Sequence, residues 1–369
     1  MDNMTAFSIE MYREATMPMT VEEAVEVLKV YGHFRRFGDI LRDFSAPEDP
    51  RHVLLSGLTA NHPEVLPASL DRKIRNWLAG RTDTVARVDA FEICQIFRLD
   101  LDRTDHFLRQ VTGEGIHWRD PDEIIWAYSI ANGYSYAETC SLQRCAGAQL
   151  AMLNKSAPSG IDSFTADVRE RMLPLLAEPE DVLIDHLCQT LPMLGKLHNT
   201  AYKLFRQYLE LLASGGGHKL SIQEILEQYL YRQLVPISAQ TRKSKANYTL
   251  VQKNIRQHWP DESTLSKMKN RELDVPRKVL ILLFLAMDGS DSEYEEPEDE
   301  DILTRDEVFQ NIHIRLNRML RACGFHALDP RSPFDWMILY SICVDDVWEV
   351  DQRLCRMLES LFSPEEPEL

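Results

Sequence analysis

The sequence lacks an apolar run long enough to cross a membrane. The longest run, Val279 to Met287, has nine residues, about half of the roughly 20 that a transmembrane helix needs. The first nineteen residues show no basic start followed by an apolar stretch, so they do not resemble a secretory signal. We therefore expect a soluble protein that stays in the cytoplasm.

Cysteine is scarce and shows no regular spacing. The chain has seven cysteines, an odd number, and they are embedded in helical patterns. A disulfide framework would need an even, regularly spaced set in an oxidising compartment. We therefore expect reduced thiols at positions 94, 140, 145, 188, 323, 343 and 355.

Positive charge is also in deficit. The chain has 41 Lys and Arg residues against 58 Asp and Glu residues, which gives a formal net charge of −17. Because binding to phosphate is driven by Lys and Arg, this balance excludes a protein that coats nucleic acid with its whole surface. Any contact with nucleic acid must be local.

Motifs for catalysis are absent from the sequence. There is no phosphate-cradling Gly-x-x-x-x-Gly-Lys, no Gly-x-Gly-x-x-Gly, no His-Glu-x-x-His and no Gly-x-Ser-x-Gly. The nearest approach to a metal cluster lacks the paired Cys-x-x-Cys spacing that favours zinc; it comprises Cys140, Cys145, His186 and Cys188. We expect no enzyme activity, no metal and no cofactor.

What the sequence does have is apolar residues at three- and four-residue spacing along nearly its whole length, with little period-two alternation. This pattern predicts an all-α protein. Four capping boxes, in which a Ser or Thr and a Glu three residues later satisfy each other's backbone amides, support the prediction. They are Thr20/Glu23, Ser135/Glu138, Ser221/Glu224 and Thr304/Glu307.

Two breaks divide the chain into three segments. Residues 154–160 are small and polar, and residues 215–217 are three glycines, which do not fit well inside a helix. We therefore expect an N-terminal module at 1–153, a helical middle segment at 154–217 and a C-terminal module at 218–369. The middle segment joins the modules or forms an oligomer or partner surface.

An internal repeat is the most specific signal in the sequence. Residues 103–130 align without a gap on residues 315–342, each pair being separated by 212 positions, and eight pairs are identical. Glu123 and Asp335 form a further pair that keeps its charge. We therefore expect two related helical modules.

The repeated core motif has the features of a helix start. Asp120 or Ser332 can cap a helix whose first residue is proline, and Glu123 or Asp335 then faces the positive helix end. The apolar residues that follow, 124–126 and 336–340, are expected in the core. For the adjacent arginines, Arg119 and Arg331, a structural role is favoured over an alternative role in gripping a ligand or phosphate.

Residues 249–287, upstream of the second copy, contain a further pattern. The run from Ser263 to Asn270 places Leu265 and Met268 three residues apart, as on the inner face of a helix, after Asp261 as the cap. Val279 to Leu285 would form the next buried helix. This segment resembles the helix-turn-helix of phage-repressor-like (Cro/C1 or xenobiotic-response-element) regulators.

The resemblance implies a DNA-binding surface. In that family the recognition helix enters the major groove, reads bases from its early residues and contacts phosphates from its ends. If the matching positions of this sequence have the roles they have in the family, three residues would face bases: Ser263, Thr264 and Lys267. Six would approach the phosphate backbone: Lys253, Arg256, Lys269, Arg271, Arg277 and Lys278.

Local charge favours the same interpretation. Residues 241–280 contain ten Lys or Arg residues and four acids, a charge of +6 in a chain of −17. A confined phosphate-binding surface requires such a basic island. The alternative is a solvated helical face.

The first copy has an equivalent segment at residues 69–101, where Arg72, Lys73, Arg75 and Arg81 could face phosphate. Both copies depart from the family pattern, because neither has the usual Gln-containing supporting helix, and Arg271 stands where the family often has glycine. A degenerate helix-turn-helix kept for packing or protein contacts is the alternative.

Residues 290–301 form an acidic insert with eight acids in twelve residues. We expect a solvated loop. A second hypothesis is that the insert mimics phosphate and competes for the basic island.

Together these patterns predict a non-enzymatic regulator that binds double-stranded DNA. The competing class is a helical adaptor whose modules contact proteins or a second copy of the chain. An enzyme of an unrecognised type ranks third.

Overall fold

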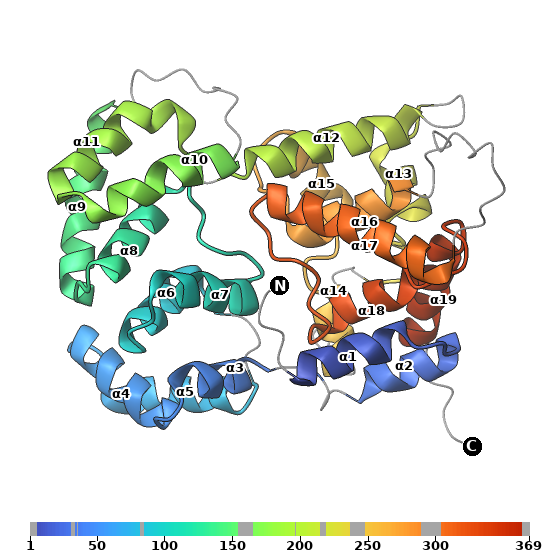
Figure 1. Ribbon diagram of the computed structural model, residues 1–369, viewed down its shortest axis with the longest axis horizontal. Helices are drawn as coiled ribbons and strands as arrows, with labels where there is room; N and C mark the ends of the chain where they lie inside the picture. The colour runs from blue at the N-terminus through green and yellow to red at the C-terminus, as the bar shows by residue number, and fades with distance from the viewer. Residues whose placement is uncertain are drawn as a thin grey trace. The chain divides into compact units, whose positions relative to one another are not determined.

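The computed structural model describes residues 6–30, 34, 36–81, 85–153, 165–195, 197–214, 219–236, 248–288 and 304–363. These residues form α-helices and short 3₁₀ turns, and their only β pairing is an isolated bridge between Glu114 and Phe325 (Figure 1). The all-α prediction is therefore confirmed. None of the described helices is both long and apolar enough to span a membrane.

The chain divides into two compact units. Unit 1 comprises residues 1–34, 201–320 and 327–369, and unit 2 comprises residues 35–200 and 321–326. The division into segments at 1–153, 154–217 and 218–369 stays a prediction. Both predicted breaks, 154–160 and 215–217, and the acidic insert 290–301 lie outside the described residues.

Unit 1 is built around α18 (Pro333–Ser341), whose residues are all buried. Contacts with α18 are made by α1, α2, α14 and α19, and α15 packs on α13. A helix that is apolar on all sides belongs in a core, as predicted for residues 336–340. The other helices are α1 (Ala6–Thr16), α2 (Val21–Lys29), α12 (Asn199–Ser214), α13 (Ile222–Gln228), α14 (Leu250–Arg256), α15 (Glu262–Lys269), α16 (Arg277–Asp288), α17 (Arg305–Ala322) and α19 (Glu349–Phe362).

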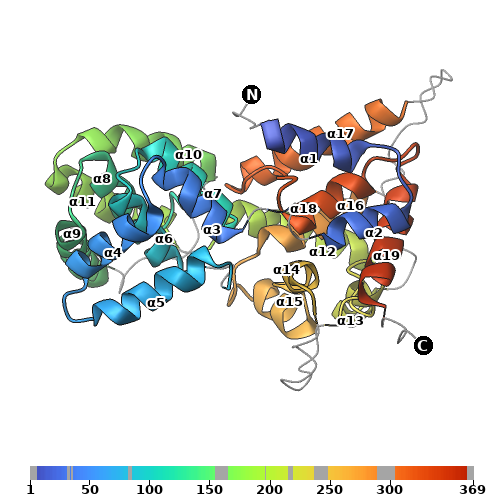
Figure 2. The same ribbon diagram turned by 90° about the horizontal axis from the view of Figure 1, so that it is seen from below.

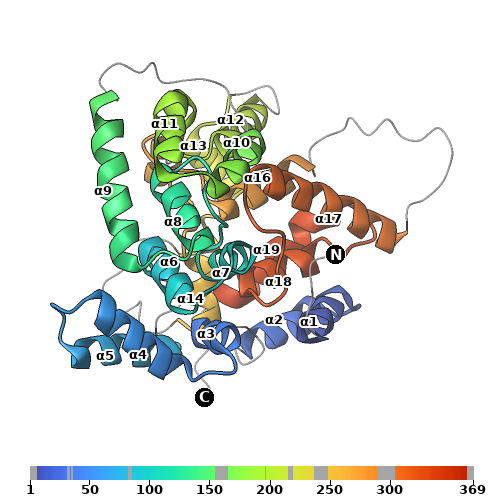
Figure 3. The same ribbon diagram turned by 60° about the vertical axis from the view of Figure 1, so that its left-hand side comes forward.

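Unit 2 has a central helix of the same kind, α8 (Pro121–Ala131), with Glu123 to Ser129 buried. It contacts α6, α7 and α9, and α9 also packs on α11 (Figure 3). The other helices are α3 (Phe37–Ser45), α4 (Pro50–Asn61), α5 (Pro67–Leu78), α6 (Arg87–Ile96), α7 (Leu101–Thr112), α9 (Tyr136–Leu153), α10 (Thr165–Met172) and α11 (Glu180–Thr190), with 3₁₀ turns at Leu173–Ala177 and Leu191–Met193.

The predicted helix starts are found in the structure. All four capping boxes form their reciprocal hydrogen bonds. Pro121 and Pro333 each occupy the first helical position. The Asp120 side chain accepts a hydrogen bond from the amide of Asp122, whereas the predicted cap Ser332 makes no side-chain hydrogen bond to the start of α18. These caps satisfy amides that the first turn of a helix leaves without partners.

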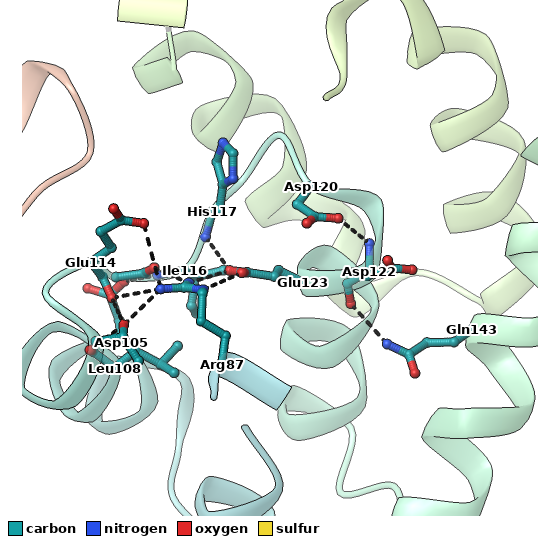
Figure 4. Close-up of polar contacts among 12 residues, drawn as sticks. Arg87, Asp105, Leu108, Glu114, Ile116, His117, Asp120, Asp122, Glu123 and Gln143 are labelled. Carbon is teal, nitrogen blue, oxygen red and sulfur yellow. Dashed lines mark hydrogen bonds and ion pairs between the residues drawn. The ribbon is translucent and has the colours of Figure 1, made fainter. Parts of the chain in front are cut away.

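A partly buried arginine begins α6 in unit 2 and organises the loop before α8. Arg87 forms a bidentate ion pair with Glu123, at 2.5 and 2.6 Å, and donates to the carbonyl oxygen of Gly115 at 2.7 Å (Figure 4). Glu123 also accepts from the amide of His117, and Asp105 accepts from the amide of Ile116, both at 2.8 Å. We call this set the arginine frame of unit 2.

The same contacts recur in unit 1. Arg277 begins α16, pairs with Asp335 at 2.7 and 2.8 Å, and donates to the carbonyl oxygen of Ala327 at 3.1 Å. Asp335 accepts from the amide of Asp329, and Asn317 accepts from the amide of Leu328. Apart from the arginines, each member of this second arginine frame lies 212 residues after its counterpart.

Candidate nucleic-acid interface

The segment that resembles a helix-turn-helix lies in helices α14 and α15 (Figure 2). Five residues, 257–261, separate them, and His258 within this turn has a positive φ of 56°. In unit 2, α4 and α5 are also separated by five residues, 62–66. Two short helices joined by a tight turn are the general form of a helix-turn-helix, although the usual turn has three or four residues.

Helix α15 has a distinct inner and outer face. Leu265 and Met268 are buried, whereas Ser263 and Lys267 are exposed. Ser263 and Lys267 are four residues apart, so they share one face of the helix. This face is the one that the sequence predicted to approach base edges.

Thr264 requires a correction, because its hydroxyl is used within the helix cap. The hydroxyl accepts from the amide of Asp261 at 2.9 Å and donates to the carbonyl oxygen of Asp261 at 3.0 Å. The Asp261 carboxylate in turn accepts from the amide of Thr264. Thr264 therefore stabilises the start of α15 rather than facing bases.

Three predicted phosphate-facing lysines have the expected exposure. Lys253 on α14 and Lys267 and Lys269 on α15 are exposed. Within the described part of the chain, none of them has an acidic group at ion-pair distance. Their ammonium groups therefore face solvent without local neutralisation.

Two predicted arginines lie over aromatic rings. The guanidinium of Arg256 is 4.9 Å from the ring centroid of Tyr248, and that of Arg271 is 4.6 Å from the ring centroid of Tyr202. Such cation–π contacts are attractive and hold the guanidinium against the ring. Tyr202 and Tyr248 are thus site residues that sequence reasoning missed.

Arg277 and Lys278 were predicted to approach phosphate, and the structure places both charges inside unit 1. Arg277 is 9% exposed and paired with Asp335. The Lys278 ammonium donates to the carbonyl oxygens of Asn254, Ile255 and Gln257 at 2.6 to 3.1 Å. Both residues are therefore excluded from the interface.

The environment of Lys278 also shifts its ionisation. Burial lowers the pKa of Lys278 to about 7, while the nearby Asp335 carboxylate opposes the shift. The three carbonyl acceptors satisfy the end of α14, which would otherwise leave these groups without donors. Lys278 is therefore the C-terminal cap of α14.

These placements reduce the basic island. Three of its ten cations, Arg242, Lys243 and Lys245, lie outside the described residues, and Arg277 and Lys278 are internal. The five that stay at the surface face four acids in the same stretch, so the described surface is only slightly cationic.

The corresponding helix of unit 2, α5, has a different charge arrangement. Lys73 pairs with Asp89 at 2.9 Å, and Arg75 pairs with Asp71 at 3.1 Å, whereas Arg72 and Arg81 are exposed. Half of the predicted phosphate-facing cations of this copy are thus neutralised by neighbouring acids.

The arginines of the repeated motif have structural roles, as favoured from sequence. Arg119 is 3% exposed and donates to the carbonyl oxygens of Met193 and Leu197 at 2.9 and 3.1 Å. Arg331 forms a bidentate pair with Asp329. Across the described residues, no three His, Cys, Asp or Glu side chains are arranged to hold a metal ion.

No signal local to the sequence could have found Tyr202, because it lies 69 positions before Arg271. The sequence placed it only within the helical middle segment at 154–217. Comparison of the chain with known proteins finds no matching family model, no matching curated protein and no matching solved structure.

Proposed function

We propose that the protein is a non-enzymatic regulator that acts in the cytoplasm and binds double-stranded DNA through α14 and α15. The observation that carries the proposal is the set of exposed lysines, Lys253, Lys267 and Lys269, which have no acidic partner among the described residues. In an acidic chain, cations without local neutralisation are the groups that can displace counterions from DNA.

The outer face of α15 would enter the major groove. Ser263 and Lys267 would contact base edges, whereas Lys253, Arg256, Lys269 and Arg271 would contact backbone phosphates. Phosphate contacts would supply most of the affinity, so binding would weaken steeply with salt.

We also propose that units 1 and 2 contain diverged copies of one module. Apart from the arginines themselves, the members of the two arginine frames keep a constant 212-residue offset, which supports this origin. The different charge arrangement on α5 supports a division of roles between the copies.

The test is a salt-dependent shift assay on random duplex DNA with the full chain. Lys267→Glu with Lys269→Glu is expected to weaken binding about tenfold or more at low salt. The matched control is Arg318→Glu with Arg356→Glu, which makes the same charge change at exposed positions of α17 and α19 in unit 1. Equal losses in both variants would contradict recognition by α15.

A second candidate function is a helical adaptor that contacts proteins. The net charge of −17 and the internal roles of Thr264, Arg277 and Lys278 favour it. Absence of any binding to duplex DNA at low salt would leave the adaptor as the better proposal.

A further inference from the structure

Tyr202 on α12 brings two guanidinium groups to one phenol ring in unit 1. Arg271 lies over the face of the ring, 4.6 Å from its centroid, and Arg206 donates to the Tyr202 hydroxyl oxygen at 3.3 Å. The same hydroxyl donates to the carbonyl oxygen of Lys269 at 3.0 Å, which ties α12 to the end of α15. Two like charges that contact one side chain favour an anion nearby.

An open groove lies beside this cluster. It has a volume of about 560 Å³ and runs along α12, where Tyr202, Lys203, Arg206, Gln207 and Glu210 contribute to its lining. This volume lies within the range of about 300 to 1,000 Å³ that small-molecule sites occupy. The groove therefore has room for an anionic group beside the guanidinium of Arg206 and the ring of Tyr202, on which Arg271 lies.

Arg206 retains capacity to bind such a group. Its Nη2 pairs with Glu210 at 2.7 Å, and both of these side chains are exposed. Its Nε is buried and has no hydrogen-bond acceptor among the described residues, so the capacity lies at the end of the guanidinium that Glu210 occupies. Because exposed ion pairs are weak, an incoming anion can compete with Glu210 for this guanidinium.

The chemistry of the cluster selects a phosphate group. The planar donor fork of a guanidinium matches two oxygens of a phosphate, and it loses less hydration on binding than an ammonium does. We propose that Arg206 and Arg271, positioned by Tyr202, form a binding subsite for a phosphate group. The inference rests on the proposed function, because the phosphate is taken to belong to the bound DNA duplex. The DNA backbone would reach this subsite after it passes Lys269.

In this arrangement each side chain has a distinct task. Arg206 and Arg271 bind the phosphate oxygens. Tyr202 is a positioning residue that holds one guanidinium on its ring and the other on its hydroxyl. Glu210 is a competitor that occupies Arg206 when no phosphate is present.

The test measures duplex affinity of the full chain over a range of salt concentrations. Arg206→Gln is expected to reduce the slope of log K against log salt by about 1, as the loss of one phosphate contact does. Tyr202→Leu is expected to reduce it similarly, because Arg271 loses its support. Arg318→Gln on α17 is the control and should leave the slope unchanged.

Glu210→Gln provides the opposite test. Removing the competitor is expected to tighten binding several-fold at low salt, a gain that damage to the fold would not produce. Thermal melting of each variant checks that the helices stay intact. A normal slope in Arg206→Gln together with no gain in Glu210→Gln would overturn the subsite, while the Lys267 and Lys269 variant still tests the proposed function independently.

A second probe separates the two proposals if the chain does not bind DNA. Calorimetric titration with inorganic pyrophosphate would then show binding that is lost in Arg206→Gln, which would support the subsite for a free phosphorylated molecule and overturn the DNA-binding function. No heat with pyrophosphate in that case would overturn both.

Discussion

Arg277 illustrates how the same residue type can serve a surface or a core. In the sequence it belongs to a basic island, yet in the structure its guanidinium is buried against Asp335, 58 residues further along the chain. Local spacing cannot reveal such a partner. The repeat gives only a partial signal, because Arg87 and Arg277 lie outside its aligned residues, although each lies two residues after a valine and precedes a retained acid, Glu123 or Asp335.

Breaking this pair should destabilise unit 1 strongly. Arg277→Met leaves the Asp335 carboxylate buried without its counter-charge, which we expect to lower the free energy of unfolding by about 3 kcal/mol. Urea unfolding followed by tryptophan fluorescence measures the change, with Arg318→Met as the exposed control. A loss no larger than that of the control would show that the pair contributes little, and adding Asp335→Leu should restore much of the stability.

His117 gives unit 2 a dependence on pH. It is buried and stacked on His198, with ring centroids 4.0 Å apart and planes at 9°. Burial lowers the pKa of His117 well below its usual value, and the charges of His198, Arg87 and Arg119 lower it further. The folded protein therefore keeps this imidazole neutral at neutral pH.

The sign of the effect follows from proton binding. Below about pH 6.5 the unfolded chain takes up a proton on this residue that the folded chain does not, so stability is lost as pH falls through that range. We expect His117→Phe to flatten the loss of thermal stability between about pH 6.5 and pH 5. Parallel melting curves for both proteins across that range would contradict this assignment.

At the scale of the element, the sequence predicted helix starts better than helix ends. Capping boxes and first-turn prolines are local patterns, and the structure confirms each one that was predicted. The end of α14 depends instead on Lys278, 22 residues after Arg256, whose ammonium reaches three carbonyl oxygens. A lysine used in this way looks the same in sequence as a lysine that binds phosphate.

Removal of this cap should loosen α14 selectively. Lys278→Met leaves the last carbonyl groups of the helix without their donor, so amide hydrogen exchange in Leu250–Arg256 should become faster. Lys253→Met, at an exposed position of the same helix, is the matched control. Unchanged exchange in the Lys278 variant would mean that water replaces the ammonium without cost.

At the scale of the whole molecule, the net charge of −17 sets two opposite responses to salt. Self-repulsion within the acidic chain weakens as salt screens it, so folding stability should rise, whereas binding to DNA should fall because counterion release is less favourable.

The all-α class and the core helices were predictable because periodicity and composition are properties of the whole sequence. The pairing of Arg271 with Tyr202 was not, because it depends on the packing of distant helices.

We therefore expect the melting temperature to rise by a few degrees between about 20 and 300 mM NaCl, over which the screening length falls severalfold. Differential scanning calorimetry of the free protein measures this trend. A melting temperature that falls with salt would indicate that favourable ion pairs, such as Arg87 with Glu123, outweigh the overall repulsion.

The arginine frames have a consequence for how such a protein can change over evolutionary time. Each frame joins the start of one helix to the loop before the central helix, and none of its members lies in α4, α5, α14 or α15. Mutations on the outward faces of those helices therefore leave the attachment intact. One copy can acquire a new binding preference while the other keeps its own, and neither change requires the interior to be redesigned.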